Sequence, residues 1–143
     1  MQDRKTFIKT MGWVALGTVC LGPSLMLTGC SPMINIKPEF SDGVFRVKKT
    51  EEMNKRPVFL THPQLPHPIY LIRESENFNA LSSKCTHRAC TIRPAGKVLV
   101  CPCHGSEFAF DGSVLKGPAR ESLPSYKVVE KEDFLEIEII ENE

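Results

Sequence analysis

The amino-acid sequence predicts an all-β domain, and three observations support this fold class. Short runs rich in valine, isoleucine and aromatic residues recur from Val44 to the C-terminus, separated by turn-forming residues. The last run, residues 134–139, alternates apolar and acidic residues, as a strand with one face in water does. The 143 residues include 11 prolines, and no segment after residue 38 has the pattern of a long amphipathic helix, which prolines would interrupt.

The individual strands are expected where these runs lie. Two of them flank the polar sequence Glu74-Ser75-Glu76, which predicts a hairpin. Residues 31–38 contain two prolines and no periodicity, so we interpret them as a tether. His62 and His67 stand beside prolines and far from any cysteine in the sequence, which indicates ordinary loop residues. No internal repeat is present, and the predicted strands are 44–47, 57–60, 68–73, 77–82, 97–100, 126–129 and 134–139.

The N-terminus has the features of an export signal. A basic start is followed by an apolar stretch, residues 11–27, with three glycines and a proline inside it. As a helix, this stretch would reach only about 25 Å, which is short of a hydrocarbon core about 30 Å thick. The run from Arg4 to Lys9 resembles a twin-arginine export motif with lysine in the second place, and the general secretory route remains an alternative.

The sequence Leu27-Thr28-Gly29-Cys30 resembles the lipobox of bacterial lipoproteins. That resemblance implies cleavage before Cys30 and lipidation of its thiol, with several acyl chains for stable anchoring. The alternative is an uncleaved signal anchor. We therefore expect an export signal with a lipobox over 1–29, a lipid-anchored tether over 30–39 and a globular domain over 40–143. Either reading places the domain outside the cytoplasm, anchored to the membrane and facing the periplasm or the outer side of the cytoplasmic membrane.

The charges exclude a nucleic-acid-binding class. The chain has 18 basic and 17 acidic residues, and from Cys30 onward 15 basic residues stand against 16 acidic ones, a net charge of −1. No concentrated basic face of the kind that binds nucleic acid is indicated. The distribution is uneven, because residues 130–143 are acidic whereas Lys84, Arg88, Arg93 and Lys97 lie around the cysteine-rich part of the sequence.

Cysteines and histidines form the pattern that carries the chemistry. Cys85-x-His87 is followed after thirteen residues by Cys101-x-x-His104, and two further cysteines, Cys90 and Cys103, lie within the same 19 residues. So dense a group indicates a metal site, a disulfide framework or both. Zinc also takes two cysteines and two histidines, but a zinc site leaves Cys90 and Cys103 without a role. Two plain disulfides would leave both histidines unexplained. Two cysteines with two histidines are also the ligand set of a Rieske iron–sulfur centre.

The two motifs resemble those of Rieske proteins, and they are most similar to the high-potential branch of quinol:cytochrome c oxidoreductases. That branch has Cys-Thr-His-x-x-Cys and Cys-Pro-Cys-His-Gly-Ser, which this chain matches in residues 85–90 and 101–106. A Gly-Pro-Ala segment that covers the cluster in the family matches residues 117–119. The resemblance spans about residues 68–129, and it implies antiparallel sheets with a two-loop subdomain that binds one [2Fe–2S] cluster.

The resemblance also implies a role for each matched residue. Cys85 and Cys101 would bind the inner iron, and His87 and His104 the outer iron, with His104 as the contact for quinol. Cys90 and Cys103 would form the disulfide of the family, which fits an oxidising compartment. The other residues implied at the cluster are Ser106, a hydrogen-bond donor to cluster sulfur; Phe108, which replaces a tyrosine donor; and Gly117 and Pro118 of the cover.

The first loop departs from the quinol-oxidising branch, which has Leu-Gly where this chain has Arg88-Ala89. An apolar tip suits an apolar quinol pocket, whereas Arg88 needs an acceptor there. The alternatives for Arg88 are that it steers the centre toward an acidic donor or acceptor, or that it is only a solvated surface charge. We expect a membrane-tethered one-electron transfer protein that is at most the iron–sulfur subunit of an oxidoreductase complex. The expected complex is a quinol-oxidising respiratory one, and the expected redox partner is a cytochrome. The alternatives are a subunit or carrier for another periplasmic oxidoreductase, such as a molybdenum enzyme like arsenite oxidase, and a ferredoxin of a ring-hydroxylating oxygenase, which would lack the extra cysteine pair.

Overall fold

The computed structural model describes residues 33–139, which form strands and a single turn of 3-10 helix, η1 (Glu51–Asn54). The all-β prediction is confirmed. The export signal, Cys30 and the first part of the tether lie outside the described residues. Within residues 33–139, no helix is long and apolar enough to cross a membrane.

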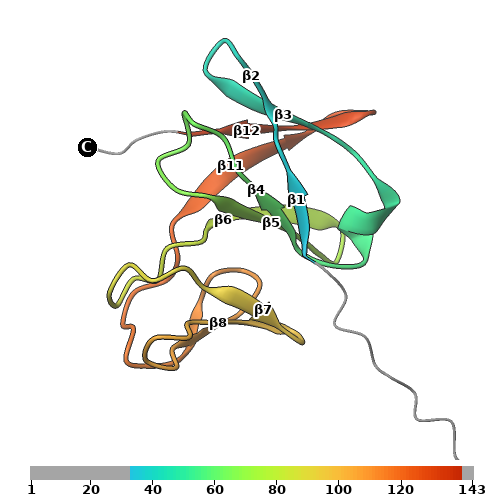
Figure 1. The fold of residues 1–143 in the computed structure, drawn as a ribbon. Helices are drawn as coiled ribbons and strands as arrows, with labels where there is room; N and C mark the ends of the chain where they lie inside the picture. The colour runs from blue at the N-terminus through green and yellow to red at the C-terminus, as the bar shows by residue number, and fades with distance from the viewer. Residues whose placement is uncertain (1–32, 140–143) are drawn as a thin grey trace, which may run out of the picture. The chain divides into compact units, whose positions relative to one another are not determined.

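Eight strands form the larger sheet, which lies above the smaller one in Figure 1. Its order is β1-β4-β5-β6-β11-β12-β3-β2. The predicted hairpin is present as β5 and β6, joined at Ser75, whose φ of 56° lies in the left-handed region. The strands of this sheet are β1 (Ile34–Ile36), β2 (Glu39–Ser41), β3 (Val44–Lys48), β4 (Val58–Leu60), β5 (Ile69–Glu74), β6 (Asn77–Ser82), β11 (Ser125–Glu130) and β12 (Phe134–Glu138).

One strand lies inside the segment interpreted as a tether. β1 pairs with β4 in parallel, with Ile34 opposite Val58, whereas the other strand pairs described are antiparallel. The apolar residues of this strand, Ile34 and Ile36, pack against the core of the large sheet. The folded domain therefore includes part of residues 31–38. The strand lies between Pro32 and Pro38, and these prolines led to the tether interpretation.

Two cores share the central strand β5, and this explains why four successive residues of it are buried. Ile69 and Leu71 point into the core enclosed by the large sheet, with Phe45, Val58 and Leu135. Tyr70 and Ile72 point the other way, into a second core beneath the small sheet. Successive side chains of a strand face opposite sides, so a strand covered on both faces is apolar throughout.

The small sheet carries the two cysteine motifs at one end. It has the order β10-β9-β8-β7, and β7 and β8 are labelled in the lower lobe of Figure 1. Leu99 and Phe108 are opposite each other in register, and both are fully buried in the second core. The neighbouring row of paired residues contains Arg93 and Glu107 and faces outward, and the two cysteine loops lie directly beyond it. The strands are β7 (Arg93–Ala95), β8 (Val98–Val100), β9 (Glu107–Phe108) and β10 (Val114–Lys116).

Candidate metal centre

The first cysteine motif forms a tight loop held by its own backbone. The N–H of Cys85 donates to the carbonyl of Cys90 at 2.8 Å, and the N–H of Ala89 donates to the carbonyl of Cys85 at 2.8 Å. A bridge between Lys84 and Thr91 closes the base of the loop. Ala89 has a φ of 58°, a left-handed conformation in which an alanine is strained and glycine is not.

The second motif repeats this construction. The N–H of Cys101 donates to the carbonyl of Ser106 at 2.8 Å, and the N–H of Gly105 donates to the carbonyl of Cys101 at 3.0 Å. Gly105 has a φ of 73° and so supplies the left-handed residue that Ala89 supplies in the first loop. In each loop the first cysteine therefore begins a turn that presents the following residues at the tip.

A disulfide joins the two loops. Cys90 and Cys103 are bonded with an S–S distance of 2.07 Å and Cα atoms 6.5 Å apart, so the pairing implied by the family resemblance is confirmed. The sulfur atoms of Cys90, Cys101 and Cys103 all lie within 4.8 Å of one another. Two of these three are already bonded to each other, so this trio is not a ligand set. Instead, it shows that the disulfide lies close to the Cys101 thiol.

Two cysteine thiols remain unbonded among the described residues, Cys85 and Cys101, and both are buried. The two side chains are close enough to interact with each other. Burial raises the pKa of the Cys85 thiol, because a thiolate loses its hydration there, and the neighbouring Cys101 acts in the same direction. The backbone N–H groups of His87 and Arg88 oppose this shift because they donate to the sulfur. Backbone donors aimed at a buried sulfur favour a thiolate ligand.

The two histidines of the motifs meet at the loop tips. Their rings lie 4.9 Å apart between centroids and are perpendicular, at 88°. His104 is exposed, whereas His87 is half-buried. Within residues 33–139, Nδ1 of His87 is the buried side-chain polar atom that has no hydrogen-bond partner. A buried nitrogen without a hydrogen-bond partner is unfavourable unless it binds another group. A histidine nitrogen can bind a metal ion only if it is free of other partners, so Nδ1 of His87 is available as a metal ligand.

The Gly-Pro-Ala segment lies against both loops. The Ser106 hydroxyl is fully buried, and its Oγ accepts a hydrogen bond from the N–H of Ala119 at 3.0 Å. The hydroxyl of Thr86 donates to the carbonyl of Glu121 at 2.7 Å, which holds the end of this segment beside the first loop. Gly117 and Pro118 are exposed between these two attachments.

Two residues of the second core support the site from below. Phe108 has no exposed surface and packs with Leu99 and Cys101, so it reaches the underside of the second loop. The buried Tyr70 hydroxyl donates to the carbonyl of Ile92 at 3.0 Å, directly after the first loop. Burial raises the pKa of Tyr70 to about 12 because it disfavours the phenolate, although the nearby Arg93 opposes this. Sequence reasoning missed Tyr70, since nothing in a strand pattern indicates where its hydroxyl points.

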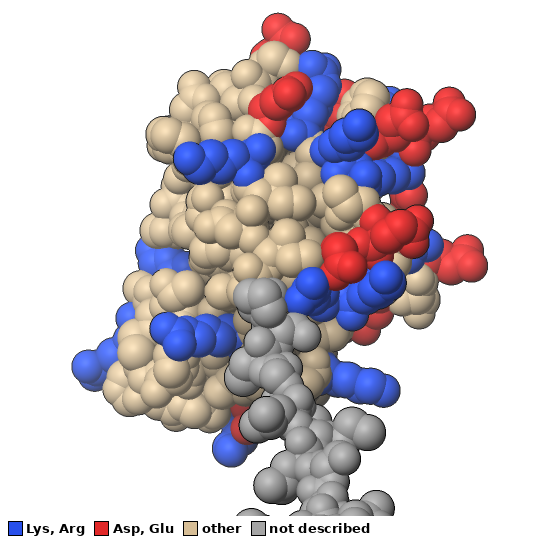
Figure 2. Space-filling model, turned by 45° about the vertical axis from the view of Figure 1, so that its right-hand side comes forward, with Lys and Arg blue, Asp and Glu red and all other residues tan. Residues whose placement is uncertain are grey.

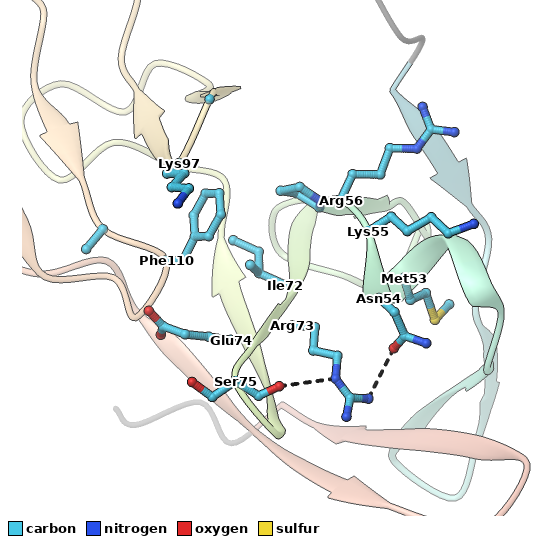
Figure 3. A pocket seen from close by; sticks show the side chains of 13 residues that line it. Met53, Asn54, Lys55, Arg56, Ile72, Arg73, Glu74, Ser75, Lys97 and Phe110 are labelled. Carbon is cyan, nitrogen blue, oxygen red and sulfur yellow. Dashed lines mark hydrogen bonds between the residues drawn. The ribbon is translucent and has the colours of Figure 1, made fainter.

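One hollow lies beside the first loop, and another lies beside the small sheet. The first, of about 460 Å³, is lined by His67, Lys84, His87, Arg88 and Glu121, among others. The second, of about 620 Å³, lies toward the β7–β8 turn and η1, where Arg73 donates to Asn54 at 3.1 Å and to the carbonyl of Ser75 at 3.3 Å (Figure 3). Lys97 of that turn is at the end of the hairpin opposite the loops, so the second hollow is separate from the candidate centre.

The donor set fits a Rieske centre. Two buried, interacting thiols and two adjacent imidazoles, one with an unsatisfied buried nitrogen, come from two loops that a disulfide joins. Thiolates and imidazoles in equal number are what the two irons of a Rieske cluster require. All four predicted ligands, Cys85, His87, Cys101 and His104, lie in these two loops, and Ser106, Phe108, Gly117 and Pro118 lie around them.

Comparison with known proteins agrees with this geometry. The Nostoc sp. cytochrome b6-f complex iron-sulfur subunit 2 is 37% identical over 73 residues, which cover 48% of this chain and 41% of that protein. The Chlorobaculum tepidum cytochrome b6-f complex iron-sulfur subunit is 32% identical over 62 residues, covering 42% of this chain and 34% of that protein. The chain thus spans less than half the length of these relatives.

A solved structure extends the similarity to the fold. The cyanobacterial plasma membrane Rieske protein PetC3 from Synechocystis PCC 6803 superposes with a TM-score of 0.58 at 29% identity, over 66% of this chain and 98% of that one. Residues 43–127, more than half of the chain, match the Rieske [2Fe-2S] domain family. The expectation of a Rieske [2Fe–2S] cluster is therefore confirmed, and the chain belongs to the Rieske [2Fe-2S] domain family.

Proposed function

We propose that this protein is the Rieske electron-transfer subunit of a quinol-oxidising respiratory complex, anchored by a lipid on Cys30 and facing the periplasm. The observation that carries the proposal is the pairing of an exposed His104 with buried thiols behind it. The relatives named above are iron–sulfur subunits of cytochrome b6-f complexes, which supports a role as a subunit of a complex that contains a cytochrome. A cytochrome or another subunit of the complex is the proposed redox partner.

The proposed ligands are Cys85 and Cys101 for one iron and His87 and His104 for the other. When bound, a Rieske cluster accepts and releases one electron. The chain's own residues define access to it: the thiols are buried beneath the loops, and His104 is exposed at the tip. If Nδ1 of each histidine binds iron, as the unsatisfied Nδ1 of His87 suggests, Nε2 of His104 would face outward. It would accept a proton from a quinol once the bound ring has released the proton that Nε2 carries in a neutral imidazole.

The ligand assignment is tested by His87→Ala and His104→Ala, with His62→Ala as the matched control. His62 lies in a loop and packs against Phe45, away from the two motifs. Iron and acid-labile sulfide are measured together with the electron paramagnetic resonance spectrum of the reduced protein. Each ligand variant is expected to lose the rhombic Rieske signal, and the control is expected to keep it. An unchanged signal in either ligand variant would contradict the assignment.

The anchor and the complex need separate tests. Mass spectrometry of protein isolated from membranes is expected to show a diacylated N-terminus at Cys30, and Cys30→Ala is expected to leave the precursor uncut. A wild-type protein that retains residues 1–29 would contradict the lipoprotein. Co-purification from gently solubilised membranes identifies the complex through its cytochrome subunits.

One observation favours a second candidate. Arg88 is exposed at the tip of the first loop, and a cation enters an apolar quinol pocket only at a high desolvation cost. A subunit or carrier for another periplasmic oxidoreductase, such as a molybdenum enzyme like arsenite oxidase, would not need an apolar tip. Co-purification with a molybdenum-containing subunit, and no reduction by a quinol analogue, would favour this candidate over the first.

A further inference from the structure

The charges of the domain are divided between its two ends. Residues 84–121, which form the small sheet, the two loops and the Gly-Pro-Ala segment, contain six basic and three acidic residues. The other described residues, 33–83 and 122–139, contain nine basic and eleven acidic residues. Figure 2 shows acidic side chains gathered on the upper part of the molecule, over the large sheet, while the lower lobe carries mainly basic ones. The end with the candidate centre is therefore positive, although residues 30–143 together have a net charge of −1.

The basic residues of this end lie next to the loops. Lys84 and Arg88 belong to the first loop, and Arg120 directly follows Ala119, whose N–H is bonded to Ser106 of the second. Arg93 and the exposed Lys116 belong to the row of the small sheet from which the loops begin. We call these five residues, all of them exposed, the basic end: Lys84, Arg88, Arg93, Lys116 and Arg120.

The acidic residues of the same region offset only half of this charge, three against six. Glu107 pairs with Lys116 at 3.0 Å, and the carboxylate of Asp111 accepts hydrogen bonds from both the N–H and the hydroxyl of Ser113. Glu121 is the remaining one, beside Arg88 in the hollow of the first loop. The net charge of residues 84–121 is +3. Two cysteine thiolates balance the charge of an oxidised [2Fe–2S] cluster, so this end stays positive in both redox states.

The two loops and the Gly-Pro-Ala segment also expose small apolar residues. Ala89, Pro102 and Pro118 are exposed there, as is His104. Apolar residues allow close, dry contact, while charges on the same surface orient the partner before contact is made.

We infer that the basic end is the docking surface for an acidic redox protein, which takes up one electron from the reduced centre beside His104. This rests on the proposed function, because it names the chemistry of the partner that receives the electron. The partner's one-electron acceptor is reduced and the iron centre is oxidised, and no bond or proton needs to move between the proteins. Arg88 is costly to bury in an apolar pocket, whereas the carboxylates of an acidic partner can form charged hydrogen bonds with its guanidinium.

The electrostatic part of the inference is tested with small oxidants of opposite charge. The reduced holoprotein is mixed by stopped flow with ferricyanide, a trivalent anion, and with tris(phenanthroline)cobalt(III), a trivalent cation, at ionic strengths from 0.01 to 0.5 M. The rate with ferricyanide is expected to fall as salt increases, and the rate with the cobalt complex to rise. The net charge of −1 would produce the opposite trends, so opposite or absent trends would overturn the inference.

Variants locate the effect on the surface. Arg88→Gln is expected to lower the rate of oxidation by ferricyanide about fourfold at 0.01 M salt. The substitution removes the attraction between the trivalent anion and one positive charge at about 10 Å in water. Lys48→Gln makes the same change of charge on an exposed residue of β3 in the large sheet, and it is expected to leave the rate within about 1.5-fold. Equal effects of the two variants would overturn the inference.

Protein probes test the partner class directly. An acidic plastocyanin and a basic mitochondrial cytochrome c both accept one electron, and their binding to the oxidised protein is followed by surface plasmon resonance. Plastocyanin is expected to bind more tightly at low salt, and Arg88→Gln to weaken that binding but not that of cytochrome c. Tighter binding of cytochrome c would overturn the inference. If the Rieske spectrum is intact while these tests fail, only the docking surface is wrong; if the spectrum is missing, the proposed function itself fails.

Discussion

Replacing Ser106 with alanine would remove a hydroxyl with two roles. Ser106 has no exposed surface, and its Oγ accepts the N–H of Ala119 at 3.0 Å. Ala119 is itself only 5% exposed, so in Ser106→Ala this N–H loses its partner where water cannot replace it. A buried donor left without a partner costs about 1–3 kcal/mol. We expect the free energy of unfolding to fall by that amount.

Guanidinium unfolding of the purified holoprotein measures this change. Ser122→Ala is the matched control, because Ser122 is exposed three residues beyond Ala119 and its replacement is expected to change stability by less than about 0.5 kcal/mol. The hydrogen of the Ser106 hydroxyl is not used in the bond with Ala119, so it remains available to a cluster sulfur. If that bond favours the reduced form by about 1.4 kcal/mol, Ser106→Ala lowers the midpoint potential by about 60 mV. Voltammetry measures the potential. Stability equal to that of Ser122→Ala would refute the structural reasoning, and an unchanged potential would refute the sulfur bond.

Three further substitutions test neighbouring features of the site. Phe108→Tyr should raise the midpoint potential by about 60 mV if the new hydroxyl donates to a ligand thiolate. If it does not, the hydroxyl is a buried donor without a partner, and the free energy of unfolding should fall by about 1–3 kcal/mol. Voltammetry and unfolding are measured together, and no change in either would show that the ring is not buried as described. Cys90→Ser should lower the free energy of unfolding by about 3 kcal/mol in the chain-entropy model, because the disulfide closes a loop over a sequence separation of 13. Alkylation of Cys90 and Cys103 in the native, oxidised wild type would contradict that prediction. Ala89→Gly should stabilise the protein by about 0.5–1 kcal/mol, since glycine removes the left-handed strain at a φ of 58° but gains entropy in the unfolded chain. An unfolding midpoint at or below that of the wild type would count against it.

The sequence by itself determined the fold class, the motifs and the cluster. The strand predicted at 134–139 from its alternation is present at Phe134–Glu138, because a period of two reflects one buried face and one face in water. The donors could be read directly, because Cys85, His87, Cys101 and His104 lie at fixed short spacings within loops. Such local spacing constrains the geometry whatever surrounds it.

The tertiary structure decided everything that depends on contacts between distant segments. β1 lies in a segment with two prolines and β9 has only two residues, so neither was predicted as a strand, and both form because neighbouring strands provide partners. The bonds from Tyr70 to Ile92 and from Thr86 to Glu121 join residues 22 and 35 positions apart. The sequence shows basic residues around the cysteine motifs, but only the fold brings Lys116 to the same end of the small sheet as the loops and Lys97 to the opposite end. Sequence patterns record which side of a strand is buried, whereas the direction of a hydroxyl and the sum of charges on a surface are set only when separate segments pack together.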